Sequence, residues 1–354
     1  MSNDIRLLIG AGKNKLDYVE KFSEALQRHN INCKLVIDVE VCNGFPSKDA
    51  GQWIRPYHRF NELVKQYKPD AVFVDRQVHF GLAAIKNRLP LFVQLRGDHW
   101  SELRWAKETM NLSLKSHFVL WLRNRITEKC LNDATMILPF SEYLSKIVKS
   151  HYPDKPTMVF QDGIDLQYWH RAEELELKHP CVGLLQNASI WGKTKEMLTL
   201  PKVLETLPHV TFYWAGDGIY KDKILSVLGK YKNFKWLGKL SYPDQVRQFL
   251  SSIDVYALLT GYDTFGMTIV EAEIMKVPVI ATNVGGTPET MIENKTGFLV
   301  SQGNHKELIE KITTLLNDQR LAKNMSEAGH AFASENFDWE KTTARFIANL
   351  KTII

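Results

Sequence analysis

Two carboxylates, Asp263 and Glu271, lie eight positions apart in the segment TGYDTFGMTIVEAEI, with Phe265, Gly266 and Met267 between them. The residues from Met267 onward predict a helix, and the free N–H groups at a helix start attract an anion such as phosphate. Gly266 allows a close approach of the backbone. Carboxylate oxygens accept hydrogen bonds from adjacent sugar hydroxyls. The segment therefore predicts a sugar-nucleotide site, and the alternative is a capping glutamate beside a surface aspartate.

Five other residues come shortly after predicted strands: Gly12, His79, Arg96, His99 and Asp217. Ligands of open parallel sheets bind at the carboxyl ends of the strands, so we expect these residues at ligand sites. His79 and His99 are expected to contact an acceptor. A packed or solvent-bound histidine is the alternative for His79, and a turn with a local ion pair is the alternative for Arg96.

Strands and helices alternate along the chain, which is typical of parallel sheets covered by helices. In the first half, strands are expected over 5–9, 34–41, 71–75, 91–95, 136–140 and 157–160, and helices over 16–29 and 54–67. In the second half, strands are expected over 181–185, 210–215, 234–237, 254–259 and 277–282, and helices over 195–206, 219–229, 243–251, 305–316, 319–335 and 338–353. We predict an α/β fold of two Rossmann-like domains facing a cleft, over residues 1–165 and 166–337. The last helix, within 338–354, is expected to cross back to the first domain.

The bulk composition is that of a globular protein. With 354 residues, 44% of them hydrophobic and 24% charged, the chain suffices for two domains and is neither disordered nor fibrous. The four cysteines are scattered without C-x-x-C spacing, so neither a disulfide framework nor a zinc site is expected. The start of the sequence does not resemble a signal peptide, and no apolar run is long enough to span a membrane. We therefore expect a cytoplasmic protein.

The net charge of +5 comes from residues 1–170. Within residues 101–131, apolar residues recur at i+4 spacing from Leu114 to Cys130, Trp121 lies beside them, and six basic residues outnumber three acidic ones. Such a helix can lie on an anionic membrane surface, which would make the protein peripheral on the inner face of the membrane. The alternative is a helix that covers the first sheet with its basic residues in water. Nucleic-acid binding is not expected, because the basic residues form no dense stripe with interleaved aromatic residues.

An ordered set of motifs resembles the group 1 glycosyltransferases (glycosyltransferase family 4), which are retaining enzymes of the GT-B fold. The segment from Asp263 to Glu271 resembles the E-x7-E signature of the family, and Gly216-Asp217-Gly218 resembles its GDG turn. Further matches are PFSEYL (139–144), DGID (162–165), CVGLL (181–185), WGKTK (191–195), NVGGTPE (283–289) and TGFLV (296–300). The resemblance thus extends over nearly the whole chain.

The resemblance implies transfer of a hexose from a nucleotide sugar with retention of anomeric configuration. Glu271 would hold the ribose hydroxyls, and Asp263 would hold hydroxyls of the transferred sugar. The N–H groups of Phe265, Gly266 and Met267 would contact that sugar and its phosphate. Asp217 lies in the matching donor-site turn.

The same resemblance implies how the leaving group is stabilised. Lys193 or Lys195 would neutralise the departing diphosphate, and Gly12 would let the first-domain loop approach the phosphates. No metal or other cofactor is expected, since the sequence has no Asp-x-Asp motif.

Three positions depart from the family pattern. Asp263 stands where the family usually has Glu, which could change the sugar hydroxyl that it reaches. The phosphate-binding Arg expected just after Gly183 is absent, so Lys193, Lys195 or an Arg from elsewhere would contact the diphosphate. Arg96 occupies the place of a catalytic-site His, where it could clamp phosphate.

We therefore expect a retaining glycosyltransferase that moves a hexose from a UDP- or GDP-linked sugar to a glycan or a lipid-linked acceptor. Two alternatives stay open: a GT-B sugar-nucleotide epimerase and a non-catalytic sugar-nucleotide-binding protein. The sequence leaves the base, the transferred sugar, the acceptor and the oligomeric state undetermined.

Overall fold

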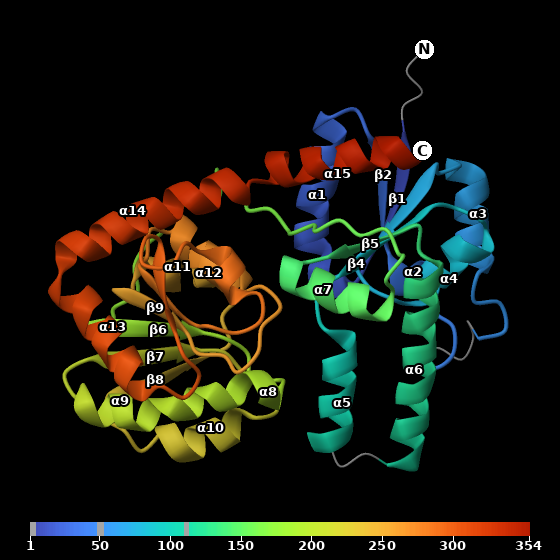
Figure 1. The fold of residues 1–354 in the computed structure, drawn as a ribbon. Coiled ribbons are helices and arrows are strands. Elements are labelled where there is room, and N and C mark those ends of the chain that lie inside the picture. Colours follow the sequence, from blue (N-terminus) through green and yellow to red (C-terminus); the bar gives the residue numbers. More distant parts are fainter. Residues whose placement is uncertain (1–4, 48–52, 110–112) are drawn as a thin grey trace. The chain divides into compact units, whose positions relative to one another are not determined.

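The computed structural model describes residues 5–47, 53–109 and 113–354, and the chain divides into two compact units (Figure 1). Unit 1 comprises Met1–Gly163 and Trp339–Ile354, and unit 2 comprises Ile164–Asp338. Sequence analysis placed the corresponding boundaries at 165 and 337. Each unit is built on its own parallel sheet, in accordance with the predicted α/β class.

The sheet of unit 1 has the strand order β2-β1-β3-β4-β5, and all its pairs are parallel. Its strands are β1 (Arg6–Ala11), β2 (Asn32–Ile37), β3 (Ala71–Val74), β4 (Leu91–Leu95) and β5 (Met136–Pro139). Its helices before residue 164 are α1 (Leu16–Arg28), α2 (Asp38–Val41), α3 (His58–Tyr67), α4 (His79–Lys86), α5 (His99–Thr109), α6 (Leu114–Asp133) and α7 (Glu142–His151), with a 3-10 turn at Lys13–Lys15. The central strands β3 and β4 are fully buried, and Gln94 is their one polar residue, because helices cover both faces of the sheet.

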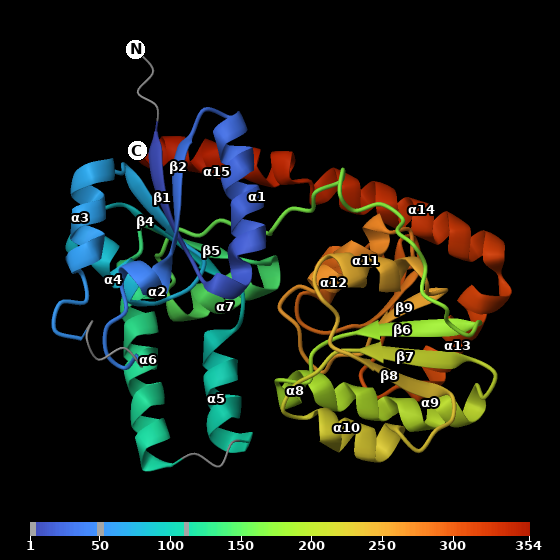
Figure 2. The same ribbon diagram turned by 180° about the vertical axis from the view of Figure 1, so that it is seen from behind.

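Helix α15 (Trp339–Ile353) completes the core of unit 1. It lies beside α1 in both ribbon views (Figures 1 and 2). Phe346 is fully buried, and its ring centroid lies 5.2 Å from that of Phe22 on α1. At Gly163, a Cβ atom would come within 2.5 Å of the Trp339 Cα, so the chain can pass α15 there only with glycine.

The sheet of unit 2 has the strand order β11-β10-β9-β6-β7-β8, again with parallel pairs. Its strands are β6 (Cys181–Leu185), β7 (Thr211–Ala215), β8 (Phe234–Gly238), β9 (Val255–Leu258), β10 (Val279–Thr282) and β11 (Gly297–Val300). Its α-helices are α8 (Trp191–Thr194), α9 (Leu200–Thr206), α10 (Lys221–Leu228), α11 (Asp244–Ser251), α12 (Met267–Ile274), α13 (His305–Asn317) and α14 (Gln319–Asn336), with 3-10 turns at Lys195–Thr199 and Thr287–Thr290. Figure 2 shows α9 and α10 on one side of this sheet and α11 and α12 on the other.

Several element predictions were wrong in detail. Residues 157–160 form no strand; they hydrogen-bond to the edge strand β5 and make a single bridge, Ile137 to Thr157. The second half of the strand predicted over 34–41 is the short helix α2, where Asp38 turns inward and is 1% exposed. The helix predicted over 195–206 begins earlier, at Trp191, and runs as three short helical segments.

Among the described residues, no helix combines the length and apolarity needed to cross a bilayer.

Candidate active site

The loop between β9 and α12 holds the first predicted donor-site residues. Gly266 precedes α12 with φ of +100°, a left-handed conformation that side chains rarely adopt. The N–H of Gly286 donates to the Asp263 carbonyl at 3.0 Å, and a Cβ atom on Gly286 would lie 2.1 Å from the Thr264 carbonyl oxygen. Two glycines therefore fix the course of this loop, and Phe265 is buried beneath it.

Lys193 on α8 lies against the same loop. Its Nζ is 3.5 Å from the Asp263 carboxylate and 5.7 Å from the centroid of the Tyr262 ring. The Gly261 N–H donates to the Lys193 carbonyl at 2.9 Å, so the two backbones touch. A Cβ atom on Gly261 would lie 3.4 Å from Cε of Lys195, which places that stem beside the loop as well. The structure thus brings Lys193, Lys195 and Asp263 together.

Glu271 projects from α12 and is 3% exposed. The charges of Glu271 and Asp263 both affect the same buried side chain, that of Tyr256. The Tyr256 hydroxyl donates to Thr268 at 2.6 Å, and burial raises the pKa of Tyr256, with further increases from the charges of Glu271 and Asp263. Both carboxylates therefore lie close enough to Tyr256, on β9, for their charges to raise its pKa.

A second carboxyl on α12, that of Glu273, is not part of this group. It is 1% exposed, and within the described chain neither of its oxygens has a hydrogen-bond partner. Burial raises its pKa to about 9, and the nearby Thr296 offsets this only in part. Glu273 is therefore a neutral carboxylic acid at pH 7.

Asp217 lies at the carboxyl end of β7, where its carboxylate accepts a hydrogen bond from the Gly218 N–H at 2.7 Å. Lys221 Nζ lies 3.7 Å from that carboxylate and 4.9 Å from the centroid of the Trp236 ring. The side chain of Asp217 is half-exposed, so it can still reach a ligand. The sequence pattern did not single out Lys221 or Trp236, although Lys221 follows the GDG turn closely.

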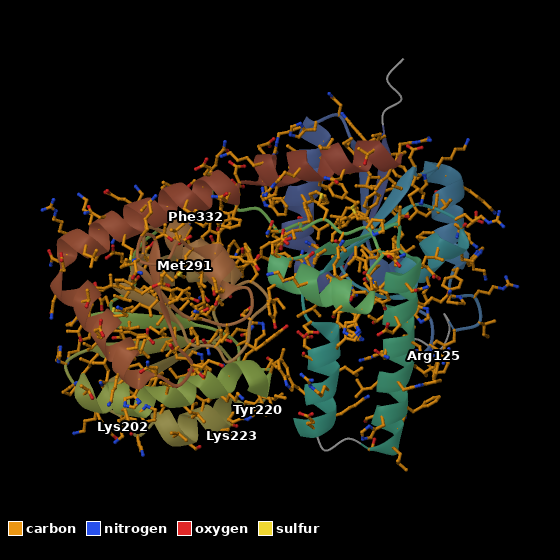
Figure 3. The ribbon with its side chains drawn as sticks, in the orientation of Figure 1. Arg125, Lys202, Tyr220, Lys223, Met291 and Phe332 are labelled. Atoms are coloured by element: carbon orange, nitrogen blue, oxygen red, sulfur yellow. The ribbon has the colours of Figure 1, made fainter. Side chains whose placement is uncertain are left out.

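An aromatic and basic cluster flanks α8, and sequence reasoning also missed it. The rings of Trp191 and Tyr220 lie 5.3 Å apart, and Lys223 Nζ is 3.6 Å from the centroid of the Trp191 ring. Figure 3 labels Tyr220 and Lys223 near the start of α10. An indole beside a lysine suits stacking on a planar group next to a phosphate.

In unit 1, Gly12 lies at the end of β1 and donates its N–H to Asp75 at 3.1 Å. Burial raises the pKa of Asp75, although the cation of Arg96 and the Gly12 N–H partly oppose this rise. A Cβ atom on Gly12 would lie 3.0 Å from the Arg76 guanidinium carbon. Arg76 in turn makes two 2.6 Å hydrogen bonds to the buried carboxylate of Asp38. Because Arg76 directly follows a predicted strand, the strand-end rule could have found it.

Arg96 forms a two-pronged ion pair with the buried carboxylate of Asp162. Burial opposes the charge of Arg96, but the attraction and hydrogen bonds of Asp162 outweigh it and raise its pKa. Its guanidinium also lies 5.2 Å from the centroid of the Phe140 ring. The ion pair joins the end of β4 to the DGID segment, and Arg96 still lines a cavity of about 260 Å³ together with Gly12 and Lys15.

His79 and His99 both line a second cavity of unit 1, of about 740 Å³. His79 Nε2 lies 2.8 Å from the Phe45 carbonyl oxygen, and burial lowers the pKa of His79, so its imidazole is neutral at pH 7. His99 Nε2 lies 2.7 Å from the Asn124 Oδ1 on α6. Two residues predicted for one acceptor site thus meet at one cavity.

One group of potential metal ligands occurs among the described residues, namely His179, Cys181 and Asp254, whose ligand atoms lie within 4.8 Å of one another. It lies at the amino ends of β6 and β9, away from the loops described above. Asp254 already accepts a hydrogen bond from the Cys181 N–H at 2.7 Å and pairs with His179 at 2.8 Å. These bonds explain the cluster as a cap on the strand start.

Two Rossmann-like units, each built on a parallel sheet, make up the GT-B fold. The solved structure of Anabaena HepE in complex with UDP and glucose has this fold; it superposes with a TM-score of 0.71 at 18% identity, over 98% of this chain and 99% of HepE. Residues 193–332 match the family model of glycosyl transferases group 1.

Two curated relatives align to parts of the chain. An uncharacterized glycosyltransferase of Methanocaldococcus jannaschii is 36% identical over 239 residues, which cover 65% of this chain and 64% of that protein. A GDP-mannose-dependent monoacylated phosphatidylinositol monomannoside mannosyltransferase of Corynebacterium glutamicum is 31% identical over 157 residues, which cover 42% of this chain and 41% of that protein. The match therefore spans less than two thirds of either relative.

Proposed function

We propose that this protein is a retaining glycosyltransferase that transfers a hexose from a UDP- or GDP-linked sugar to a glycan or lipid-linked acceptor. The observation that carries the proposal is the pair of Lys193 and Asp263 at the start of α12, inside the segment of the group 1 family. When a glycosyl–phosphate bond breaks, negative charge develops on the departing diphosphate. A lysine fixed at that place stabilises it.

The other donor-site roles follow from position. Glu271 holds the ribose hydroxyls and Asp263 holds hydroxyls of the transferred sugar. We assign the backbone N–H groups of Phe265, Gly266 and Met267 to the sugar and its phosphate, although the Phe265 N–H already donates to the Asp263 carboxylate at 3.3 Å. Asp217 contributes from the loop after β7, and Lys195 shares the diphosphate charge with Lys193.

In unit 1, we assign Gly12 and Arg96, which line the 260 Å³ cavity, to phosphate binding. His79 and His99 contact the acceptor. The reaction needs no metal, so a chelator should leave it unchanged; loss of activity with EDTA that Mg²⁺ or Mn²⁺ restores would contradict this.

Both nucleotide classes have support among similar proteins, because HepE binds UDP and the Corynebacterium relative depends on GDP-mannose. The deciding experiment is thermal stabilisation against a panel of nucleotides and nucleotide sugars. A ligand at 100 times its dissociation constant adds about 2.7 kcal/mol of stability, which shifts the melting temperature measurably. A shift with one base only is expected, and no shift with any would contradict the donor site.

Product analysis separates transfer from the two alternatives. A transferase releases UDP or GDP in step with the glycosylated product. A GT-B epimerase converts the donor sugar without stoichiometric nucleotide release, and a non-catalytic binder leaves the donor intact.

We also propose that residues 101–131 attach the protein to the cytoplasmic face of an anionic membrane. On α6, Leu114 is 90% exposed, and Phe118 and Trp121 are about half exposed, with basic Lys115 and Arg125 near them. Co-sedimentation with vesicles that contain anionic lipid, but not with neutral vesicles, is expected. A double variant, Phe118→Ser with Trp121→Ser, should remain in the supernatant; equal sedimentation of the variant would refute this attachment.

A further inference from the structure

Two cavities of unit 1 adjoin each other beside α5 and α6. Arg76, Gln77, His99 and Glu102 line both the 260 Å³ cavity at Gly12 and the 740 Å³ cavity that His79 lines. The smaller one is lined by the cations Lys15, Arg76 and Arg96 and by the carboxyls Asp75 and Glu102. The larger one is lined by residues of both helices.

The contacts between α5 and α6 fix which residues face each other along the larger cavity. His99 meets Asn124 at 2.7 Å, and the Trp100 indole N–H donates to Glu128 at 3.1 Å. These contacts place the start of α5 beside the second half of α6, and Figure 1 shows that the two helices run antiparallel. With a rise of about 1.5 Å per residue, Ala106 lies about 10 Å farther from the sheet than His99.

The lining of the larger cavity changes from polar to apolar along that length. Near the shared end stand the polar groups of His99 and Asn124. Farther along, the walls are apolar, from Leu103 and Ala106 on α5 and Leu120 on α6. The exposed rings of Phe118 and Trp121, which stack 5.8 Å apart, lie on a different side of α6 from Leu120 and do not line the cavity.

Arg123 adds a cation to this apolar wall. It is exposed on α6, lines the cavity, and makes no ion pair within the described part of the chain. Arg76, the other arginine of the lining, is held by Asp38 at 2.6 Å. An anion in this cavity would therefore meet Arg123.

We infer that the larger cavity binds an amphiphilic acceptor that carries an alkyl or aryl group and a phosphate-type anion. The hydroxyl to be glycosylated lies at the shared end near His99, the anion pairs with Arg123, and the apolar group lies against Leu103, Ala106 and Leu120. This inference rests on the proposed glycosyltransferase function, whose acceptor it specifies.

The test uses n-octyl phosphate and uncharged n-octyl β-glucoside below their micelle-forming concentrations. Binding to the full chain is measured by isothermal titration calorimetry. We expect both to bind. Leu120→Ser should weaken the binding of both ligands by about 10-fold, because it removes most of one apolar side chain from the cavity lining. Leu114→Ser is the matched control, since Leu114 lies outside the cavity on the same helix and should leave both affinities unchanged.

The anion is tested separately. Arg123→Gln should lower the affinity for octyl phosphate by about 10-fold and leave the affinity for octyl glucoside unchanged. Arg125→Gln is the control, because Arg125 lies over the Trp121 ring and outside the cavity. Figure 3 labels Arg125 on α6. Equal loss in both arginine variants would overturn the role of Arg123.

A filling variant guards against misfolding of Leu120→Ser. Ala106→Leu adds volume without a polar group and should also weaken both ligands. No binding of octyl phosphate to the unaltered protein, or binding that survives both Leu120→Ser and Ala106→Leu, would overturn the inference. The nucleotide panel distinguishes the two proposals: a nucleotide shift without octyl phosphate binding overturns only the acceptor site, whereas octyl phosphate binding without any nucleotide shift overturns only the donor assignment.

Discussion

Asp263 is one methylene shorter than the glutamate that the resembled family usually has at this position, and in the structure it pairs with Lys193 at 3.5 Å. In the proposed reaction, the donor diphosphate draws Lys193 away from Asp263, so the lysine exchanges one anion for another. Asp263 then accepts hydrogen bonds from sugar hydroxyls.

Replacement of Lys193 by Met should therefore lower kcat by about 10²-fold, with a smaller change in KM, because the cation acts mainly on the charge that develops in the transition state. The measurement is the steady-state rate of nucleotide release with the donor identified by the panel. Lys202→Met serves as control, since Lys202 is an exposed residue of α9 paired with Glu205 (Figure 3). A loss confined to KM would show that Lys193 binds the ground state only.

Glu271 gives a second prediction at this scale. Glu271→Gln preserves the volume of a buried side chain but removes its charge, so nucleotide-sugar affinity should fall by about 10-fold or more while the melting temperature changes little. Calorimetric titration measures it. Glu273→Gln, two positions along the same helix, should leave the affinity unchanged. Normal affinity in Glu271→Gln would refute the ribose role.

Glu273 itself predicts a pH dependence of stability. Its pKa is about 9 in the folded protein against 4.5 for a free side chain, so the native state binds more protons between these values. The free energy of unfolding therefore falls as pH rises from 4.5 to 9, by at most about 1.4 kcal/mol per pH unit from this group. Glu273→Gln should remove that slope and stabilise the protein at pH 8. Denaturant melts of both proteins at pH 5 and pH 8 test it; parallel pH profiles would contradict the assignment.

Helix α15 is a single helix that contributes several side chains to the hydrophobic core of unit 1. Phe346 lies within 6 Å, centroid to centroid, of Phe22, Phe73, Phe92 and Phe160. Phe346→Ala should destabilise unit 1 by about 3–5 kcal/mol, because it leaves a cavity among aromatic rings. Phe332→Ala on α14 is a useful comparison, since Phe332 belongs to unit 2 and should leave unit 1 unaffected (Figure 3).

The elements also show how far the sequence could be interpreted. The central strands of both sheets were predictable because buried parallel strands are continuous apolar runs. The segment 157–160 has the same composition as a strand, but it lies beside an edge strand, and composition cannot distinguish the two. Short helices such as α2 depend on the tertiary role of one residue, in this case the burial of Asp38 against Arg76.

In the candidate site too, groups that are local in sequence could be predicted and groups that the fold brings together could not. The segment from Asp263 to Glu271 could be found because its chemistry is local in sequence. The partners Arg96 and Asp162 lie 66 positions apart, and no spacing rule links them. Trp236 was missed because only the fold brings it to Lys221, whereas Lys221 lies four positions after Asp217 and could have been found from local sequence.

At the scale of the whole molecule, each unit has its own hydrophobic core. We therefore expect calorimetry of the full chain to resolve two unfolding transitions. The proposed donor residues Lys193, Asp263 and Glu271 lie in unit 2. A nucleotide at 100 times its dissociation constant should therefore raise the free energy of unfolding of that unit by about 2.7 kcal/mol, and its transition should move to a higher temperature. Phe346→Ala identifies the other transition. A single transition that moves with both changes would contradict independent units.

The position of α15 in the chain also has a consequence for the order of biosynthesis. The strands of unit 1 are made first, but Trp339 and Phe346 leave the ribosome only after the roughly 175 residues of unit 2. At about 5–20 residues per second, this delay is about 10 to 35 s. During that time the aromatic core of unit 1 lacks one of its covering helices, whereas unit 2 is a continuous segment that can fold as soon as it emerges. The second unit of this protein can thus finish folding before the first.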